Sequence, residues 1–296
     1  QFNPTSYLVG LAAAVQARGG QIHQQTRALS FERNERWQIG FDGGTIQADQ
    51  VIIATHLPVE TPIDMASPTQ PRCHVAIAFR PEDGASLDGM FIAVEEPTHS
   101  IRMGRDEHGP LLLVLGPRFN TGQDGDVAKR FVDLEQWARS NLPVGEAVWR
   151  WCNEDYDTAD RMAYVGEADP EQAPGLFIAT GFNAWGISNG TAAGLGIARQ
   201  IVTGRRPWKT LFDPQRPSPD DYNQSGESQS QVDDLEAIGP GEGGVITRGD
   251  EQIAVWRDDA GALHGVSAAC THMGCSVTWN NADRTWDCPC HGSIFQ

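Results

Sequence analysis

The sequence lacks the long apolar runs and the basic segments that would tie it to a membrane or to nucleic acid. Its longest apolar stretches, such as Leu111–Leu115, fall far short of the ~20 residues that a bilayer-spanning helix needs. No segment is rich in Lys or Arg, and the formal net charge of -17 repels phosphate backbones. No positively charged, apolar leader opens the sequence. We therefore expect no transmembrane segment, no nucleic-acid partner and a cytoplasmic protein.

Cysteine is also scarce, and its distribution is uneven. Of the six cysteines, four fall within 21 residues near the C-terminal end and stand beside histidines. In a chain of this size, such clustering argues for a metal site rather than for a set of structural disulfides. We expect the isolated Cys73 and Cys152 to be small core residues.

The first part of the chain combines one helix with short strands. Residues 4–18 carry Pro in the first turn and apolar residues at helical spacing, and Gly19 and Gly20 end the predicted helix. Residues 50–54 (QVIIA) are continuously apolar, a pattern typical of a central parallel strand that is buried on both faces. Further strands are predicted over 21–23, 28–33, 37–41 and 45–48.

From residue 73 the pattern changes to strands joined by short turns, which predicts an antiparallel sheet. The predicted strands cover 73–79, 90–95, 100–105, 111–115 and 148–152, with an amphipathic helix over 126–141. Residues 175–179 predict a second buried strand. A turn rich in Gly and Asn follows, and then a helix from about 191 to 202 that ends at Gly204.

Residues 212–234 are rich in Pro, Ser, Gln and Asp and contain almost nothing apolar, which predicts a linker. Residues 236–296 then form short strands and turns around the clustered Cys and His. The only formal match to the phosphate-binding pattern G-x-G-x-x-G lies there, at 239–244. Because this match contains Pro and precedes a strand instead of a helix, we interpret it as a turn that opens the C-terminal domain.

The clustered cysteines and histidines form two short boxes. They contain C-x-H and C-x-x-H with 15 residues between them, so each loop offers one thiolate and one imidazole. A Rieske centre takes this set, since two Cys hold one iron of a two-iron two-sulfur (2Fe-2S) cluster and two His hold the other. Structural zinc is the alternative, although its paired ligands usually lie about two to four residues apart on both sides. The predicted cluster ligands are Cys270, His272, Cys288 and His291.

The two boxes, CTHMGC at 270–275 and CPCHGS at 288–293, resemble those of the respiratory-type Rieske proteins. The resemblance implies a disulfide between Cys275 and Cys290, with two free thiols beside the cluster as the alternative. It also implies a hydrogen bond from Ser293 to a cluster sulfide. A Tyr two residues later often donates another such bond in the family. Phe295 stands there in this sequence, so we expect a lower reduction potential than in the respiratory members.

Residues 179–191 (ATGFNAWGISNGT) resemble the C-terminal flavin-contacting motif of the glycine oxidase and D-amino-acid oxidase superfamily. A buried strand ends there, glycines let the backbone approach a flat ligand, and a helix is expected to begin near 190–191. Its N-terminal N–H groups can stabilise negative charge on a reduced flavin. Residues 50–55 and 28–29 resemble the family's segments near the FAD phosphates and adenine. The implied FAD contacts are Ala28, Ala54, Thr55, Gly181, Gly186, Ser188, Asn189, Gly190 and Thr191.

The resemblance implies an α/β (α+β) FAD-binding domain with an inserted antiparallel β substrate domain, followed by a small all-β Rieske domain. An opening strand with G-x-G-x-x-G and the last strands that cover a Rieske cluster are both missing, so we expect the middle of a longer protein. The implied boundaries are 1–58 and 166–211 for the FAD-binding domain, 59–165 for the substrate domain, 212–235 for the linker and 236–296 for the Rieske domain.

Together these features predict an FAD-dependent oxidoreductase that takes a hydride from a C–N bond of an amine or amino acid. The cluster would move single electrons to or from the flavin, which implies an unidentified redox partner. The acidic surface is either a docking face for that partner or an ordinary solvated surface. The alternative function is a Rieske electron-transfer protein fused to a binding domain without flavin. A ring-hydroxylating oxygenase is disfavoured because no close pair of histidines outside the cluster could hold its mononuclear iron.

The substrate-binding residues are less well defined by sequence. Arg102, Arg105 and Arg161 are candidate carboxylate anchors because guanidinium groups bind carboxylates in a bidentate manner, with structural roles as the alternative. His56 and Tyr164 lie near contact positions of the family, and core roles are equally compatible with the pattern. No Ser-His-Asp arrangement supports hydrolysis, and no catalytic base can be named.

Overall fold

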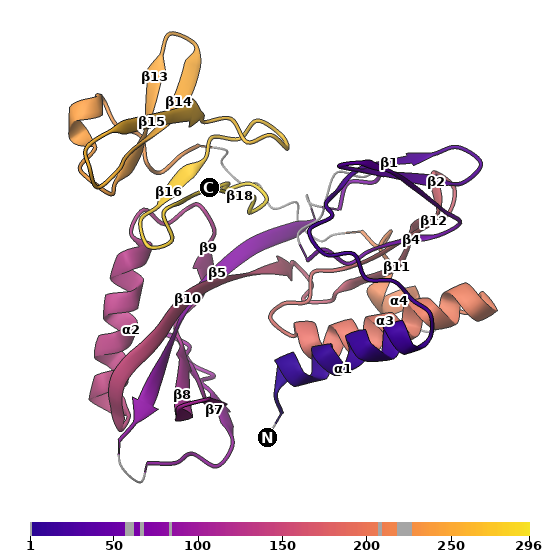
Figure 1. The fold of residues 1–296 in the computed structure, drawn as a ribbon, viewed down its shortest axis with the longest axis horizontal. Helices are drawn as coiled ribbons and strands as arrows, with labels where there is room; N and C mark the ends of the chain where they lie inside the picture. The colour runs from indigo at the N-terminus through magenta and orange to yellow at the C-terminus, as the bar shows by residue number, and fades with distance from the viewer. Residues whose placement is uncertain (1, 57–61, 66–67, 83–84, 207–208, 218–226) are drawn as a thin grey trace. The chain divides into compact units, whose positions relative to one another are not determined.

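The computed structural model describes residues 2–56, 62–65, 68–82, 85–206, 209–217 and 227–296 (Figure 1). The chain forms two compact units, the first from Gln1–Met65 with Asp160–Pro219 and the second from Ala66–Ala159 with Asp220–Gln296. The predicted boundary at 58–59 and residues 218–226 of the predicted linker lie outside the described residues. The predicted substrate sheet and the Cys/His region therefore belong to one unit, although they are far apart in the sequence.

The first unit opens with the predicted helix, α1 (Pro4–Ala17). Asn3 begins it, because its side-chain oxygen accepts a hydrogen bond from the Ser6 N–H at 3.0 Å, and Pro occupies the first turn. Strands β1 (Ala28–Arg33), β2 (Trp37–Phe41) and β3 (Gly44–Ala48) follow as an antiparallel sheet. The prediction of a further strand over 21–23 is wrong, since these residues form no strand.

A second sheet of the first unit has the strand order β11–β12–β4, from Tyr164–Asp169, Ala173–Thr180 and Val51–Ile53. The parallel pairing of β4 is confirmed, with Ile52 opposite Phe177. The predicted central position is wrong within the described residues, because β4 lies at the edge and Ile52 is 49 % exposed. A short apolar run shows that a strand can be buried, but it does not show what covers each face.

Helices α3 (Gly186–Thr203) and α4 (Lys209–Phe212) complete the first unit. Ala193 and Ile197 of α3 are buried against Phe177 and Ala179 of β12. Gly204 ends α3 in the left-handed conformation at φ 68°, as its position after the predicted helix indicates. Helix α3 begins at Gly186, one turn before the predicted start, which changes the local geometry of the predicted flavin motif.

The second unit contains an antiparallel sheet of strand order β10–β5–β8–β7–β6, with β9 paired to β5. Helix α2 (Val127–Asn141) packs on one face of it, where Leu134 and Ala138 meet Val75 and Ile77 in the core (Figure 1). This is the predicted antiparallel domain. Its strands are β5 (Thr69–Pro81), β6 (Met90–Ile92), β7 (Ser100–Asp106), β8 (Gly109–Leu115), β9 (Phe119–Asn120) and β10 (Val144–Thr158).

The C-terminal part of the second unit is all-β apart from one short turn of 3-10 helix, Leu235–Ala237. The turn that begins at Gly239 leads directly into a strand that starts at Gly243, which confirms that the G-x-G-x-x-G match is not a phosphate loop. The strands form two three-stranded sheets. They are β13 (Gly243–Arg248), β14 (Glu251–Arg257), β15 (Leu263–Ser267), β16 (Thr278–Asn280), β17 (Thr285–Asp287) and β18 (Ile294–Phe295).

Residues at the end of the predicted linker lie against this C-terminal part. The Val232 N–H donates to the Val245 carbonyl at 2.9 Å, and the Val245 N–H donates to the Ser230 carbonyl at 2.7 Å. The packed part of the C-terminal domain therefore begins before residue 236 among the described residues. No helix in the described part of the chain is long and apolar enough to cross a membrane.

Candidate functional site: a cluster-binding pair of loops and a flavin motif

The two Cys/His boxes fold into loops with the same hydrogen-bond pattern. In the first loop the Cys270 N–H donates to the Cys275 carbonyl at 2.8 Å, and the Gly274 N–H donates to the Cys270 carbonyl at 2.8 Å. In the second loop the Cys288 N–H donates to the Ser293 carbonyl at 2.8 Å, and the Gly292 N–H donates to the Cys288 carbonyl at 3.0 Å. Both loop glycines have φ above +70°, a conformation that glycine adopts without strain.

The predicted ligands pair across the two loops, the Cys270 thiol with the Cys288 thiol and the His272 imidazole with the His291 imidazole. The thiols of Cys270 and Cys288 are buried, whereas the imidazoles of His272 and His291 are half-buried. The two imidazole rings lie edge to face, with centroids 4.8 Å apart. The two loops thus supply two buried thiols and two partly exposed imidazoles, the donor set that a Rieske cluster takes.

The environment of the thiols explains why cations are needed there. Burial, together with the neighbouring Cys270 thiol, raises the pKa of the Cys288 thiol to about 11. Two thiolates are therefore unfavourable in this pocket unless iron neutralises them. The donor set and its burial fit a 2Fe-2S cluster, and we propose Cys270, His272, Cys288 and His291 as its ligands.

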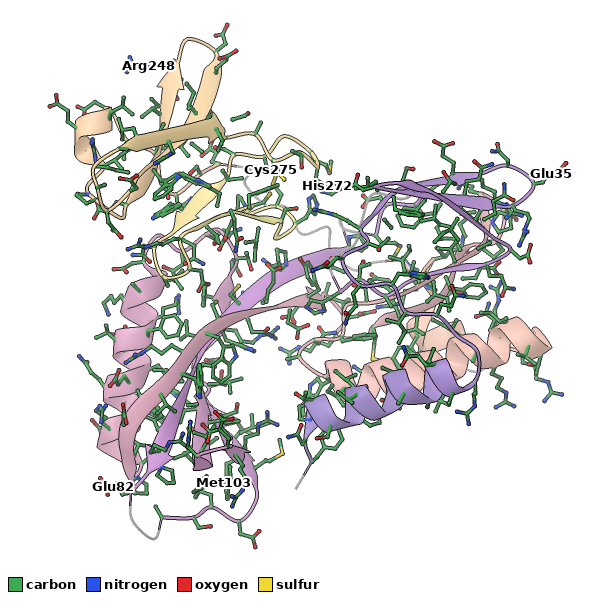
Figure 2. All side chains as sticks on the ribbon, in the orientation of Figure 1. Glu35, Glu82, Met103, Arg248, His272 and Cys275 are labelled. Carbon is green, nitrogen blue, oxygen red and sulfur yellow. A yellow bond between two sulfur atoms is a disulfide. The ribbon has the colours of Figure 1, made fainter. Side chains whose placement is uncertain are left out.

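A disulfide ties the two loops together. Cys275 and Cys290 are bonded, with Cα atoms 6.5 Å apart, so the pairing that the Rieske resemblance implies is present. The Cys288 sulfur lies within 4.8 Å of both disulfide sulfurs. The disulfide therefore stands next to the ligands, although its own sulfurs have no thiolate to offer a metal. Figure 2 labels His272 and Cys275 on the first loop.

Two residues beside the second loop could not be predicted from sequence. Tyr156 of β10 is 1 % exposed, and its hydroxyl lies 3.1 Å from the His291 carbonyl oxygen and 2.9 Å from Glu154 Oε2. Burial raises the pKa of Glu154 to about 8, so this carboxyl is protonated at neutral pH. Burial also raises the pKa of Tyr156, which keeps the phenol protonated. No local motif marks either residue, because the contact joins positions 135 residues apart.

The predicted flavin motif lies on the turn between β12 and α3. Gly181, Asn183 and Ala184 all have positive φ, so the backbone turns sharply after the buried strand. Because α3 begins at Gly186, its first N–H groups belong to residues 186–188, and the expected start at 190–191 is wrong. No side chain caps this end of α3. Its uncapped N–H groups can therefore interact with a negatively charged ligand.

The polar side chains of this motif make local hydrogen bonds. The Ser188 hydroxyl donates to the Trp185 carbonyl at 3.2 Å, and the Asn189 amide donates to the Phe182 carbonyl at 3.3 Å. The Thr191 hydroxyl donates to the Ile187 carbonyl at 2.7 Å and lies 2.9 Å from the Tyr7 hydroxyl of α1. Contacts to FAD from these positions would therefore come mainly from the main chain.

A cavity of about 450 Å³ lies between the sheet and α3 in the first unit. The predicted contacts Ala54 and Gly190 both line it, so the structure brings these two together. Its walls are almost wholly apolar, which suits a ring system or an aliphatic group rather than phosphate. The other predicted positions lie elsewhere: Ala28 begins β1, Thr55 follows β4, and Gly181 follows β12.

The three candidate arginines do not form one group. Arg102 and Arg105 both belong to β7. Ile101 and Met103 of the same strand face the core that α2 covers. Because side chains alternate along a strand, Arg102 points to the opposite face of the sheet. Arg102 is half-buried and Arg105 is exposed. No described carboxylate forms an ion pair with Arg102. Arg161 belongs to the other unit and is exposed at φ 60°.

The two remaining candidates differ: the His56 side chain is exposed, so a core role is wrong for it, whereas Tyr164 is buried. The His56 carbonyl accepts a hydrogen bond from the Thr180 hydroxyl at 3.0 Å, which joins the ends of β4 and β12. Tyr164 is 1 % exposed, and the Arg216 guanidinium lies 3.8 Å from its ring centroid. Of the two readings that the sequence left open for Tyr164, the structure favours the core role.

Comparisons with known proteins agree with this division. The family model "FAD dependent oxidoreductase" (DAO) matches residues 1–200, and the model "Rieske [2Fe-2S] domain" matches residues 229–296. The Cys/His region alone is 44 % identical over 64 residues to the cytochrome b6-f complex iron-sulfur subunit of Fritillaria agrestis, covering 21 % of this chain and 28 % of that protein.

One curated relative matches along the whole chain. The putative Rieske 2Fe-2S iron-sulfur protein YhfW of Bacillus subtilis is 28 % identical over 313 residues, covering 100 % of this chain and 61 % of the relative. The chain therefore spans less than two thirds of that protein's length. The shared length shows that both regions recur together in another protein.

Solved structures resemble the larger region in fold. Glycine oxidase from Geobacillus kaustophilus has a TM-score of 0.53 at 20 % identity, covering 71 % of this chain and 57 % of that one. L-proline dehydrogenase from P. horikoshii has a TM-score of 0.52 at 19 % identity, covering 71 % and 59 %. The family match, the fold and the two loops lead to one conclusion: the chain belongs to the DAO family of FAD-dependent oxidoreductases and carries a C-terminal Rieske [2Fe-2S] domain.

Proposed function

We propose that this chain is part of an FAD-dependent oxidoreductase that oxidises a C–N bond of an amine or amino acid. Its Rieske cluster would relay single electrons to or from the flavin. The observation that carries the proposal is the presence, in one chain, of a DAO-family region and a complete pair of cluster-binding loops. An oxidase that passes both electrons directly to oxygen has no need of the second centre.

The first unit supplies groups suited to an electron-rich cofactor. Residues 186–188 at the start of α3 present N–H groups that no side chain caps, and the helix dipole adds positive potential there. Bound flavin supplies hydride acceptance and one-electron transfer, while the protein supplies orientation and charge stabilisation. We propose Ala28, Ala54, Thr55, Gly181, Gly186, Ser188, Asn189, Gly190 and Thr191 as FAD contacts.

The inserted sheet supplies one suitable anchor for a substrate carboxylate. Arg102 lies on the sheet face that α2 does not cover, and it is only half-exposed. A half-buried guanidinium gains most from a carboxylate that can accept two parallel hydrogen bonds. The structural neighbours include proteins named for glycine, L-proline and iminodiacetate, which all carry a carboxylate beside a C–N bond. These names support the substrate class without identifying the substrate.

The half-buried imidazoles suggest where electrons leave or enter the cluster. The thiol ligands are buried, whereas His272 is partly exposed and the adjacent Met273 is 62 % exposed. An electron partner would therefore approach the cluster at His272. The formal charge of -17 favours a partner with a basic docking face, whose encounter would weaken as salt rises.

The test is an anaerobic titration of the full-length protein with a panel of amines and amino acids. The expected result is flavin absorption in the resting protein, bleaching of that absorption by at least one substrate, and the electron paramagnetic resonance (EPR) signal of a reduced Rieske cluster. Without oxygen, the appearance of that signal after flavin bleaching would place the cluster after the flavin in the electron path.

Two other results would point elsewhere. Cluster absorption without any flavin absorption would favour a Rieske electron-transfer protein fused to a flavin-free binding domain. Flavin that is reduced by substrate while the cluster stays oxidised, even after long incubation, would mean that the two centres do not exchange electrons. Chemical reduction of the cluster by dithionite in the same sample is the control that it is redox-active.

A further inference from the structure

The second cluster loop is pressed against the inserted antiparallel domain. A Cβ atom placed on Gly292 would meet the Glu154 carboxylate and would lie 2.7 Å from the Pro71 Cβ, closer than real Cβ atoms come to their neighbours. Pro71 and Glu154 belong to β5 and β10, two adjacent strands of the sheet. The loop that carries His291 therefore has no room for a side chain between itself and this sheet.

A second close approach involves the beginning of the same loop. Gly122, in the turn after β9, has φ +65°, and a Cβ there would lie 2.7 Å from the Pro289 nitrogen and 2.8 Å from the Asp287 carbonyl. Pro289 follows the ligand Cys288 directly. The inserted domain thus contacts the second loop both before and after its two ligands.

A hydrogen bond connects these surfaces at a ligand. The Tyr156 hydroxyl oxygen lies 3.1 Å from the carbonyl oxygen of His291 and 2.9 Å from Glu154 Oε2. The Tyr156 side chain is 1 % exposed, so its hydroxyl is shielded from water. The Gly292 N–H, on the same peptide group, donates to the Cys288 carbonyl at 3.0 Å. One tyrosine hydroxyl is thereby linked to both ligands of the second loop.

We propose that Tyr156 is a positioning residue of the iron–sulfur centre, and that the inserted antiparallel domain forms part of the protein shell that sets the cluster's reduction potential. The proposal depends on the cluster ligands but not on the identity of the substrate. It assigns to the sheet a role in the redox centre, in addition to any role in substrate binding.

The hydrogen bond has a definite electrostatic direction. The Tyr156 hydroxyl has only one proton to donate. Because Glu154 is protonated, it can donate to the Tyr156 oxygen while Tyr156 donates to the His291 carbonyl, which turns the positive end of the hydroxyl dipole toward the loop. This donation also polarises the His291–Gly292 peptide, which strengthens the hydrogen bond from the Gly292 N–H to the main-chain carbonyl of Cys288. Both effects favour the reduced cluster, which carries one more negative charge. Loss of the hydroxyl should therefore lower the reduction potential.

The experiment is a redox titration of the holoprotein, followed by EPR, for the wild type and three variants. Tyr156→Phe removes the hydroxyl and keeps the ring, and we expect a lower potential and an altered EPR line shape. Replacement of Tyr156 by 3-fluorotyrosine keeps the shape but makes the hydroxyl a stronger donor, and we expect a higher potential. These opposite shifts distinguish a hydrogen bond from a mere change of packing.

Asn281→Ala is the matched control. Asn281 also joins the Rieske domain to the inserted domain, through the start of α2, but it does not contact the second cluster loop. Its loss should leave the potential unchanged. The proposal fails if Tyr156→Phe has the wild-type potential, or if Asn281→Ala shifts the potential as much as Tyr156→Phe does. If Tyr156→Phe does not retain a cluster, the fluorotyrosine protein decides, and an unchanged or lowered potential in that protein overturns the proposal.

Discussion

Asn281, in the turn between β16 and β17, donates a hydrogen bond from its side-chain amide to the carboxylate of Asp126, 3.1 Å away. The same Asn281 side chain accepts a hydrogen bond at 2.9 Å from the N–H of Ala128 in the first turn of α2. Asp126 itself caps α2 by accepting from the Lys129 N–H. A residue of the Rieske domain thus completes the N-terminal cap of a helix in the inserted domain.

We expect Asn281→Ala to lower the free energy of unfolding of the second unit by about 1–2 kcal/mol, because one cap hydrogen bond and one bond to a charged group are lost. Chemical denaturation of the holoprotein, followed by tryptophan fluorescence, measures the change. Asn153→Ala is the control, since the exposed Asn153 amide makes only a long hydrogen bond of 3.4 Å. Equal losses in the two variants would contradict the assigned role of Asn281.

The hydrogen bond between Asn281 and Asp126 also predicts that folding stability depends on pH. The hydrogen bond from Asn281 holds the pKa of Asp126 below its ordinary value. A carboxylate with a lowered pKa stabilises the folded state above its unfolded pKa, and this contribution disappears as pH falls through the lowered value. The stability difference between wild type and Asn281→Ala should therefore shrink in acid. A difference that stays constant from neutral pH to well below pH ~3.9, the ordinary pKa of an Asp carboxyl, would show that the carboxylate is not involved.

The local sequence motifs predicted the cluster loops well, and the reason is physical. Each box of six residues closes on itself through hydrogen bonds between its own backbone groups, so its geometry depends little on the rest of the chain. The Rieske resemblance then implied the Cys275–Cys290 disulfide, which the structure contains. The shell around the loops could not be predicted, because Tyr156 and Asn281 act across 135 and 155 residues and carry no local pattern.

The errors in the predicted fold have a similar origin. The apolar run at β4 predicted a buried strand, but periodicity does not reveal whether neighbours cover one face or both. The Gly- and Asn-rich turn before α3 delayed the predicted helix start, because these residues have low helix propensity. Tertiary packing of the following turns extends α3 back to Gly186.

Phe295 offers a direct test of redox tuning. We expect Phe295→Tyr to raise the cluster's reduction potential, since a hydroxyl there can donate a hydrogen bond to a ligand sulfur and stabilise the reduced state. One such bond of about 1 kcal/mol corresponds to roughly 40 mV for a one-electron couple. Phe91→Tyr, at a side chain that is 49 % exposed on β6, is the control for the same chemical change. An unchanged or lowered potential in Phe295→Tyr would remove Phe295 as the cause of a low potential.

The Cys275–Cys290 disulfide closes a loop of sequence separation 15. Its removal by Cys275→Ser should cost roughly 3 kcal/mol of unfolding free energy in the chain-entropy model, and the cluster should be lost more readily on heating. Cys290→Ser should have the same effect. The double variant should be no worse than either single one, because both break one bond. Clearly additive losses would mean that the two cysteines contribute separately rather than as a disulfide.

Glu154 predicts a pH dependence of the opposite kind. Burial raises its pKa to about 8, so the folded protein holds a proton that the unfolded chain releases above ~4.3. Folding stability should therefore fall as pH rises from ~4.3 to about 8 and then level off. Glu154→Gln cannot ionise, so this variant should lose less stability over that range. Denaturation midpoints across the range measure the difference, with the exposed Glu35→Gln as the control. Parallel profiles for wild type and Glu154→Gln would show that the buried carboxyl does not titrate there.

Arg102 and Arg105 provide a matched pair for the proposed substrate site, since they lie on one strand and face opposite sides of the sheet. We expect Arg102→Gln to raise KM for a carboxylate substrate at least tenfold, because a charge-assisted hydrogen bond contributes about 1.5–3 kcal/mol. The potential and EPR signal of the cluster should stay unchanged. Arg105→Gln should leave KM within twofold of wild type, since its exposed guanidinium is already solvated.

Equal effects of the two substitutions would mean that charge in general, and not a specific anchor at Arg102, attracts the substrate. A substrate amine without a carboxylate should not distinguish the variants, which separates loss of anchoring from loss of fold.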